Sequence, residues 1–244
     1  MLLALGAWLG LIRVWQHYFE PHPEWARKLL HVGVGMVGFG FPFVTNSRLE
    51  VWVLCGVAAV TMLGLRLWKP LKNGLGGVLG SVNRVSLGEF YFLLGLPALF
   101  TLSQGGALYG TALAILTFAD AVAALVGTFY GKRRFSNEAD AKSLEGSAAF
   151  FVVSFIVCWT GLGVNGVLPL EAGLTAFTVS LLMALLEAVA KDGLDNVLLP
   201  VSTYLLLRAL LGLDAGALLV AGITASVIVA GVAMGSRAVT EVRA

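Results

Sequence analysis

Chemically capable side chains gather in four short segments of an otherwise apolar sequence. The first segment is RKLLH, in which Arg27 and Lys28 precede His31 by four and three residues. This spacing brings both cations to the face of a helix that carries the imidazole. The second is SLGEFYF, where Glu89 begins an apolar run and would be favoured by the positive end of a helix dipole. These segments offer phosphate-binding cations, a base and an acid.

The third segment begins with FADAVAALVGTFYGKRR. Asp120 lies inside an apolar run, where an ionisable side chain is costly and is by default a functional candidate. Ala124, Gly127 and Gly131 follow it at +4, +7 and +11, a small-residue stripe that suits close helix packing. GTFYGKR is not a Walker A loop, because one residue is missing between its glycines and Arg follows the Lys.

The same segment continues to KSLEGS, which opens the next apolar run. Lys142, Ser143 and the backbone N–H of Gly146 could hold phosphate at a helix N-terminus. Ser143 also predicts a helix N-cap, with Glu145 in the first turn. Both interpretations can hold together, and Lys132 adds a further cation before the segment.

The fourth segment is LLEAVAKDGLDNVLLP. Glu187, Asp192, Asp195 and Asn196 place three acids and an amide within ten residues. This is a dense set of oxygen ligands of the kind that Mg²⁺ prefers, and Asp192 and Asp195 could share a helical face. The alternative is a solvated loop that caps two helices.

The elements that must position these segments are membrane helices. The chain of 244 residues is 58% hydrophobic and 12% charged, with a mean hydropathy of +0.89, whereas a soluble domain is about 25% charged. About 20 apolar residues cross a bilayer. We therefore expect an all-α, polytopic membrane helix bundle that forms a single domain over residues 1–244. About nine transmembrane segments are predicted, at residues 2–16, 29–45, 49–67, 88–103, 106–130, 146–163, 172–190, 196–213 and 215–236.

The positions of the cations predict how this bundle is oriented. Of the 16 lysines and arginines, only Arg48 and Arg208 fall near even-numbered connections. Because cytoplasmic loops carry an excess of Lys and Arg, we expect the N-terminus outside and the C-terminus in the cytoplasm. All four segments would then lie at or near the cytoplasmic face of the cell membrane.

Acids able to hold Mg²⁺ and cations able to hold phosphates, gathered at one membrane face, indicate phosphoryl or nucleotidyl transfer. Positioning and charge neutralisation do most of the catalysis in such reactions. A lipid acceptor would explain why the site is embedded among membrane spans. We expect membrane lipids as the surroundings and no nucleic-acid partner.

The ordered set of motifs resembles the polyprenol kinase family, which includes dolichol kinase, phytol kinase and CTP-dependent diacylglycerol kinase. RKLLH, the early GE, DAVAALVGTFYGK with KSLEG, and E-x₄-D-x₂-DN-x₃-P carry the resemblance from Arg27 to Pro200. Part of the pattern is also similar to phosphatidate cytidylyltransferases. Those enzymes close with a PGHGG-containing signature, however, and no histidine follows His31 here.

The resemblance implies transfer of the γ-phosphoryl group of CTP to a lipid hydroxyl, with Mg²⁺ as cofactor. It also implies functional positions at Arg27, Lys28, Asp120, Gly127, Gly131, Lys132, Lys142, Ser143, Glu145, Glu187, Asp192, Asp195 and Asn196. Gly146 belongs to the same nucleotide-binding set.

Within this set we assign roles by charge. Asp120, Asp192 and Asp195 are the expected metal ligands and catalytic acids. The expected ligands of the triphosphate are Lys132, Lys142, Arg27 and Lys28. His31 or Glu187 would orient or deprotonate the attacking hydroxyl.

Three alternatives stay open at this point. The acceptor could be diacylglycerol, or the reaction could be that of a phosphatidate cytidylyltransferase. A transporter could use Asp120 and Glu187 as an ion relay, although it should show an internal repeat with paired broken helices, and the sequence shows no such repeat. The small-residue stripe could pack helices within one chain or between two copies in a homodimer.

One distance adds a structural expectation. Asp120 and Lys132 would lie about 18 Å apart in a straight helix. We therefore predict an interruption near Gly127–Gly131, with Asp120 lining a wet cavity.

Overall fold

The computed structural model describes residues 2–67, 87–135 and 142–242. Their regular elements are helices. In addition, one isolated antiparallel bridge pairs Arg134 with Ser143. The predicted all-α class is confirmed for this part of the chain. The elements are α1 (Leu2–Phe19), α2 (Pro23–Phe39), α3 (Phe41–Val44), α4 (Arg48–Leu67), α6 (Gly88–Ser103), α7 (Ala107–Ala114), η2 (Ile115–Ala119), α8 (Asp120–Tyr130), α9 (Leu144–Val164), α10 (Pro169–Val189), α11 (Asp195–Leu210) and α12 (Ala215–Val242).

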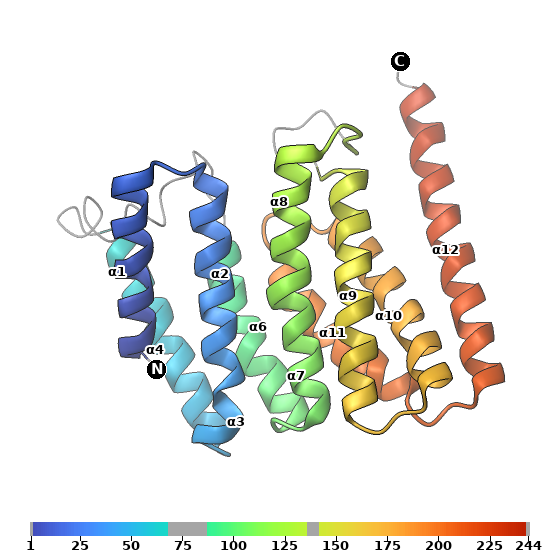
Figure 1. Ribbon diagram of the computed structural model, residues 1–244, viewed down its shortest axis with the longest axis horizontal. Coiled ribbons are helices and arrows are strands. Elements are labelled where there is room, and N and C mark those ends of the chain that lie inside the picture. Colours follow the sequence, from blue (N-terminus) through green and yellow to red (C-terminus); the bar gives the residue numbers. More distant parts are fainter. Residues whose placement is uncertain (1, 68–86, 136–141, 243–244) are drawn as a thin grey trace.

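The helices pack in two rows. In one row α1 packs on α2, α2 on α8, and α8 on α9; in the other α4 packs on α6, α6 on α11, and α11 on α10. α10 joins the rows by packing on α9, and α12 packs on its outer side (Figure 1). The four chemical segments come from both rows, so only the packed bundle brings them together.

Helix direction alternates as the cation pattern predicted. Figure 1 shows the α1–α2 and α8–α9 connections and the C-terminus at one end of the bundle, and the N-terminus at the other. Arg48 and Arg208 lie at that other end, at the start of α4 and in the last turn of α11. The assignment of the first end to the cytoplasm stays a prediction.

The number of membrane spans also stays a prediction. Each of the nine expected segments overlaps one of the described helices or the continuous α7–η2–α8 rod. Five helices within the described residues are long and apolar enough to cross a membrane: Arg48–Leu67, Ala107–Tyr130, Leu144–Val164, Pro169–Val189 and Ala215–Met234. α6 and α11 have 16 residues each, which is about 24 Å and shorter than a hydrocarbon core of about 30 Å.

The rod that carries Asp120 contains a π-helical turn that the sequence pattern did not predict. Ile115–Ala119 forms this turn, η2, between α7 and α8. Asp120 is the first α-helical residue after it. π turns inside α-helices occur frequently at functional sites, and this one stands next to the buried acid.

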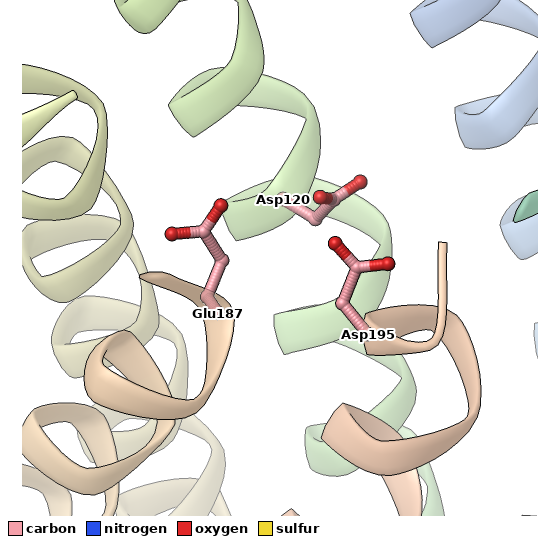
Figure 2. Close-up of side chains that lie close together, drawn as sticks. All are labelled: Asp120, Glu187 and Asp195. Atoms are coloured by element: carbon pink, nitrogen blue, oxygen red, sulfur yellow. The ribbon is translucent and has the colours of Figure 1, made fainter. Parts of the chain in front are cut away.

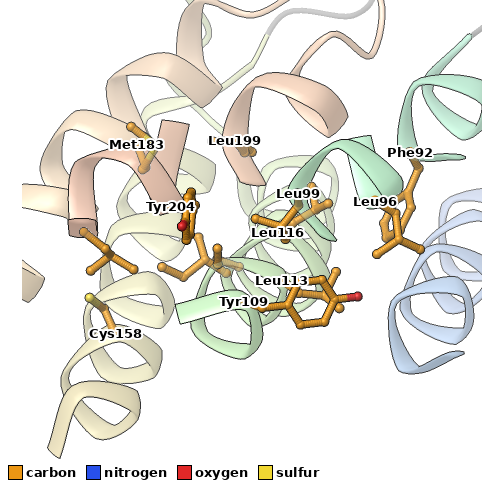
Figure 3. Packing of buried hydrophobic residues seen from close by; sticks show 14 of the residues in the cluster. Phe92, Leu96, Leu99, Tyr109, Leu113, Leu116, Cys158, Met183, Leu199 and Tyr204 are labelled. Carbon is orange, nitrogen blue, oxygen red and sulfur yellow. The ribbon is translucent and has the colours of Figure 1, made fainter. Parts of the chain in front are cut away.

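The apolar core lies directly beneath the charged residues. Leu99 of α6, Leu113 of α7, Leu116 of η2 and Leu199 of α11 have no exposed surface and meet in the centre of the bundle (Figure 3). The Tyr109 hydroxyl donates a hydrogen bond to the carbonyl oxygen of Gly38 across 2.7 Å. This core fixes the three helix ends that carry the acids.

Candidate active site

Three carboxylates from three helices converge inside the bundle. Asp120 begins α8, Glu187 lies in the last turn of α10, and Asp195 begins α11. All three are buried, and one oxygen from each lies within 4.8 Å of the others (Figure 2). The structure thus brings together residues that are up to 75 positions apart in sequence (195 − 120).

Two lysines neutralise these carboxylates. Lys28 Nζ lies 2.5 Å from Asp120 Oδ2, and both side chains are buried. Lys142 Nζ lies 2.6 Å from Glu187 Oε1 and 2.8 Å from Asp195 Oδ2. Buried charges are tolerated when they are paired and hydrogen-bonded. We call these five residues, Lys28, Asp120, Lys142, Glu187 and Asp195, the acid–lysine cluster.

His31 connects this cluster to the π turn. Its Nε2 lies 2.9 Å from the carbonyl oxygen of Leu116 and 3.4 Å from Asp120 Oδ2. A carbonyl oxygen only accepts, so Nε2 carries the hydrogen and donates it to Leu116. In the neutral ring Nδ1 is then the basic nitrogen.

The connection between α10 and α11 determines which acids reach the cluster. Gly193 adopts a φ of +87°, and a Cβ there would stand 2.4 Å from the Cα of Gly88 at the start of α6. This close backbone contact holds the connection between α10 and α11 against the start of α6. Asp195 faces inward as a result.

Asp192 does not join the acids. It has a φ of +56° in a left-handed turn and its side chain is exposed. Since the residues between Asp192 and Asp195 form a turn and not a helix, the two carboxylates do not share a helical face. Glu187 stands in the acidic group where the sequence had placed Asp192.

The chain folds back after α8 and delivers Lys142 to the cluster. The Phe135 N–H donates to the Lys142 carbonyl and the Leu144 N–H donates to the Arg133 carbonyl, each across 2.9 Å. Glu145 fixes the start of this fold, since its carboxylate accepts hydrogen bonds from the N–H groups of Lys132 and Arg133. Its carboxylate is therefore engaged by backbone donors.

Ser143 and Ser147 complete the opening of α9. Ser143 is the predicted N-cap, and its Oγ accepts a hydrogen bond from the N–H of Gly146 across 3.1 Å. One turn later, the Ser147 hydroxyl lies 3.3 Å from Glu187 Oε2 and donates to it. The sequence predicted Ser147 as a second phosphate-binding hydroxyl beside Ser143, and the structure pairs it with Glu187.

The three glycines of this region permit close packing of α8 and α9. A Cβ on Gly131 would stand 2.7 Å from Ser143 Oγ, one on Gly127 would stand 3.2 Å from the same atom, and one on Gly146 would stand 2.9 Å from the Ala123 carbonyl oxygen. α8 continues through Gly127 and ends at Tyr130, with Gly131 extended. The predicted interruption therefore falls at the end of the stripe, not within it.

A small cleft opens beside the cluster. It is lined by Arg27, Leu30, His31, Val34, Met62, Gly88, Glu89, Phe92 and Asn196, and it holds about 30 Å³. Asp120 does not line this cleft, so the prediction that Asp120 lines a wet cavity is wrong for it. Arg27 is paired with Glu24, whose Oε2 lies 3.0 Å from the Arg27 Nε.

The predicted triphosphate ligands thus differ in their surroundings. Lys28 and Lys142 belong to the cluster, and Arg27 lines the cleft, while the side chain of Lys132 is exposed beyond α8.

Burial lowers the pKa of Lys142, but Asp195 and Glu187 outweigh this effect and raise it above its ordinary value. The Lys142 ammonium is therefore charged at neutral pH.

Comparisons with known proteins bear on this arrangement. No family model matches the chain, and no solved structure matches it significantly. The chain is 28% identical over 190 residues to the phytol kinase of Synechocystis sp. (strain ATCC 27184 / PCC 6803 / Kazusa), an alignment that covers 75% of this chain and 78% of that protein. Over three quarters of its length, this chain is thus similar to an enzyme named as a kinase of a lipid alcohol.

Proposed function

We propose that this protein transfers the γ-phosphoryl group of CTP to the hydroxyl of a membrane lipid alcohol, an isoprenoid such as phytol or polyprenol. The similarity to a phytol kinase supports a kinase that acts on a lipid alcohol. CTP as donor follows from the resemblance of the motifs. The observation that carries the proposal is the acid–lysine cluster, in which three buried carboxylates are paired with the buried Lys28 and the partly buried Lys142 inside a membrane bundle.

The carboxylates fit the cofactor that this reaction needs. Three carboxylates with oxygens within 4.8 Å form an oxygen donor set that suits Mg²⁺. Asp120, Glu187 and Asp195 would hold the ion, which when bound supplies charge neutralisation to the phosphate oxygens. Lys28 and Lys142 would place positive charge against the same triphosphate.

The reaction itself needs one bond made and one broken. The lipid hydroxyl oxygen attacks the γ-phosphorus, the bond to the bridging oxygen breaks, and CDP leaves. The hydroxyl proton must pass to a base. Glu187 is engaged by Lys142 and Ser147, whereas Nδ1 of His31 has no hydrogen-bond partner within the described residues. We therefore assign the proton to His31.

The test is a transfer assay with purified protein, Mg²⁺ and CTP labelled either at the γ-phosphate or in the nucleoside. The acceptors are phytol, a polyprenol, diacylglycerol and phosphatidate, and ATP, GTP and UTP serve as competing donors. We expect the γ label on an isoprenoid alcohol. Nucleoside label on phosphatidate, with release of pyrophosphate, would replace the proposal by a cytidylyltransferase, and no transfer to any acceptor would refute it.

A further inference from the structure

The cleft beside the cluster has polar residues at the start of α2 and α6 and apolar residues one or two turns further along these two helices. On α2, Arg27 and His31 precede Val34; on α6, Glu89 precedes Phe92 by one turn. α2 packs chiefly on α1 and α8, whereas α6 packs on α4 and α11. The cleft therefore lies at the seam between two groups of helices, with its polar end at the level of the cluster.

Asn196 lines this cleft, and its side-chain oxygen is a buried, unpaired acceptor. Its side chain is 7% exposed, and Oδ1 has no hydrogen-bond partner within the described part of the chain. Nδ2 donates to the Gly193 carbonyl across 3.1 Å and faces Asp195 Oδ1 across 3.3 Å. Because both of these groups are acceptors, they fix which end of the amide is nitrogen. Oδ1 is the side-chain atom left for a ligand.

An unpaired buried amide oxygen is unfavourable unless a ligand supplies a donor. The adjoining wall offers a place for an apolar chain, formed by Leu30, Val34, Met62 and Phe92. A hydroxyl attached to a hydrocarbon would pair with the amide oxygen and also pack on the apolar wall. A water molecule would pair with the amide oxygen but would not cover the wall, although a cleft of about 30 Å³ has room for it.

Two residues of the cleft also touch the cluster. The N–H of Asn196 lies 3.1 Å from Asp195 Oδ1, and His31 Nε2 lies 3.4 Å from Asp120 Oδ2. A hydroxyl bound at Asn196 would therefore lie beside the carboxylates that face the phosphates. The cleft is in the right place for an acceptor.

We propose that this cleft receives the head of the acceptor alcohol, with Oδ1 of Asn196 accepting the hydrogen bond that the hydroxyl donates. This inference rests on the proposed function and assigns Asn196 to the lipid, where the sequence motifs had assigned it to the nucleotide. The first carbons of the alcohol pack on Val34, Met62 and Phe92. For the reaction, the O–H turns from Oδ1 of Asn196 to Nδ1 of His31. Nδ1 takes the proton as the alcohol oxygen forms the new P–O bond to the γ-phosphorus, the bond to the bridging oxygen breaks, and CDP leaves.

The first experiment measures binding without any phosphoryl transfer. Protein in nanodiscs is photo-crosslinked with a diazirine-bearing isoprenoid alcohol or with its methyl ether, which lacks the donor. We expect the alcohol to label α2, α4 and α6 at the cleft residues at least several-fold more than the ether. Asn196→Ala should remove this preference. Equal labelling by alcohol and ether in the wild type would overturn the proposal, whether or not the protein is a kinase.

The second experiment separates the two substrates kinetically. Asn196→Ala should raise the KM for the alcohol about tenfold, the loss of one hydrogen bond, and leave the KM for CTP unchanged. Thr203→Val is the matched control, because Thr203 is buried on the same helix with an equally unpaired Oγ1 but does not line the cleft. A rise in the KM for CTP alone would return Asn196 to the nucleotide and overturn the inference.

Met62→Trp tests the cleft without altering Asn196. The larger side chain fills the apolar wall, so alcohol labelling at α2 and α6 should be lost while CTP binding persists. Unchanged labelling in this variant would place the alcohol elsewhere and contradict the proposal, even if Asn196→Ala failed to fold.

Discussion

The acid–lysine cluster and the turn Gly131–Arg134 are both charged, but they hold their charges differently. In the cluster each side chain forms an ion pair with another side chain at 2.5–2.8 Å, Lys142 being shared by two acids, and both partners of the Lys28–Asp120 pair are buried. In the turn, Lys132 and Arg133 are exposed, and the contacts with Glu145 go through their backbone N–H groups. We infer that the charged side chains of the cluster take part in the reaction. In the turn, the structure fixes the backbone and leaves the charged side chains exposed.

The largest effect should come from Asp120→Asn, which removes the acid that pairs with Lys28. Turnover should fall to background. Since a buried ammonium loses its partner, the unfolding free energy should also fall by about 3–5 kcal/mol. Measurements are phosphoryl transfer and thermal unfolding in detergent. The double variant Lys28→Met/Asp120→Asn should recover stability but not activity. A single variant Asp120→Asn that is both stable and active would show that the buried cluster is no more important than the exposed turn.

Lys142→Met should have the next largest effect. It removes a charge that lies against Glu187 and Asp195, and it should weaken CTP binding about ten- to a hundredfold. Calorimetric titration with CTP in nanodiscs measures this directly. Lys142→Arg keeps the charge and should recover part of the affinity for CTP. Undiminished CTP binding by Lys142→Met would show that Lys142 does not contact the triphosphate.

Packing at the fold-back gives a smaller effect that falls on stability. Gly146→Ala places a Cβ 2.9 Å from the Ala123 carbonyl oxygen and should cost about 1–3 kcal/mol of unfolding free energy. Gly163→Ala, on the same helix with nothing within 4 Å of its Cβ, is the control and should be neutral or slightly stabilising. Equal unfolding temperatures for the two variants would show that α8 and α9 do not depend on this contact.

In the turn, Lys132→Ala should weaken CTP binding only a few-fold. An exposed charge is screened by salt, so the difference from wild type should shrink as NaCl rises from about 0.05 M to about 0.5 M. Titrations at both salt concentrations measure it. A loss as large as that of Lys142→Met, insensitive to salt, would place Lys132 in the buried site.

The smallest effect concerns pH. The pKa of Lys142 is raised, so its contribution to stability is fully present below the ordinary lysine value of about 10.4 and is lost only as pH rises through the raised value. The wild type should therefore lose none of this contribution from about pH 6 to about pH 9, and Lys142→Arg, whose guanidinium stays charged, should show the same profile of unfolding temperature against pH. A wild-type unfolding temperature that falls across this window while that of Lys142→Arg stays constant would show that Lys142 is not held by its two acids.

Much of the fold followed from the sequence because hydropathy is a local property. The starts and ends of the long helices lie within a few residues of the predicted segments, except at α2 and at the end of α12. α2 begins at Pro23, includes Arg27 and Lys28 and ends at Phe39, and α12 extends to Val242. The N-cap at Ser143 was also predictable, since a hydroxyl at the start of an apolar run has a local partner.

The composition of the site was less predictable because it depends on contacts between distant segments. The spacing of Asp192 and Asp195 suggested a shared face, but Gly193 turns the chain between them. Glu187 reaches Asp195 through Lys142, which comes from another part of the chain. Similarly, no local sequence pattern predicts the pairing of Lys28 with Asp120, which is 92 residues away.

The π turn at Ile115–Ala119 has a consequence for the rotational phase of the rod. A π turn accommodates one residue more than an α turn, so it shifts everything after it by about 100° around the helix axis. The residues of α7 can thus face the apolar core while Asp120 faces Lys28. Deleting one residue from this turn would straighten the rod and leave its length nearly unchanged, yet it would point the aspartate away from its partners.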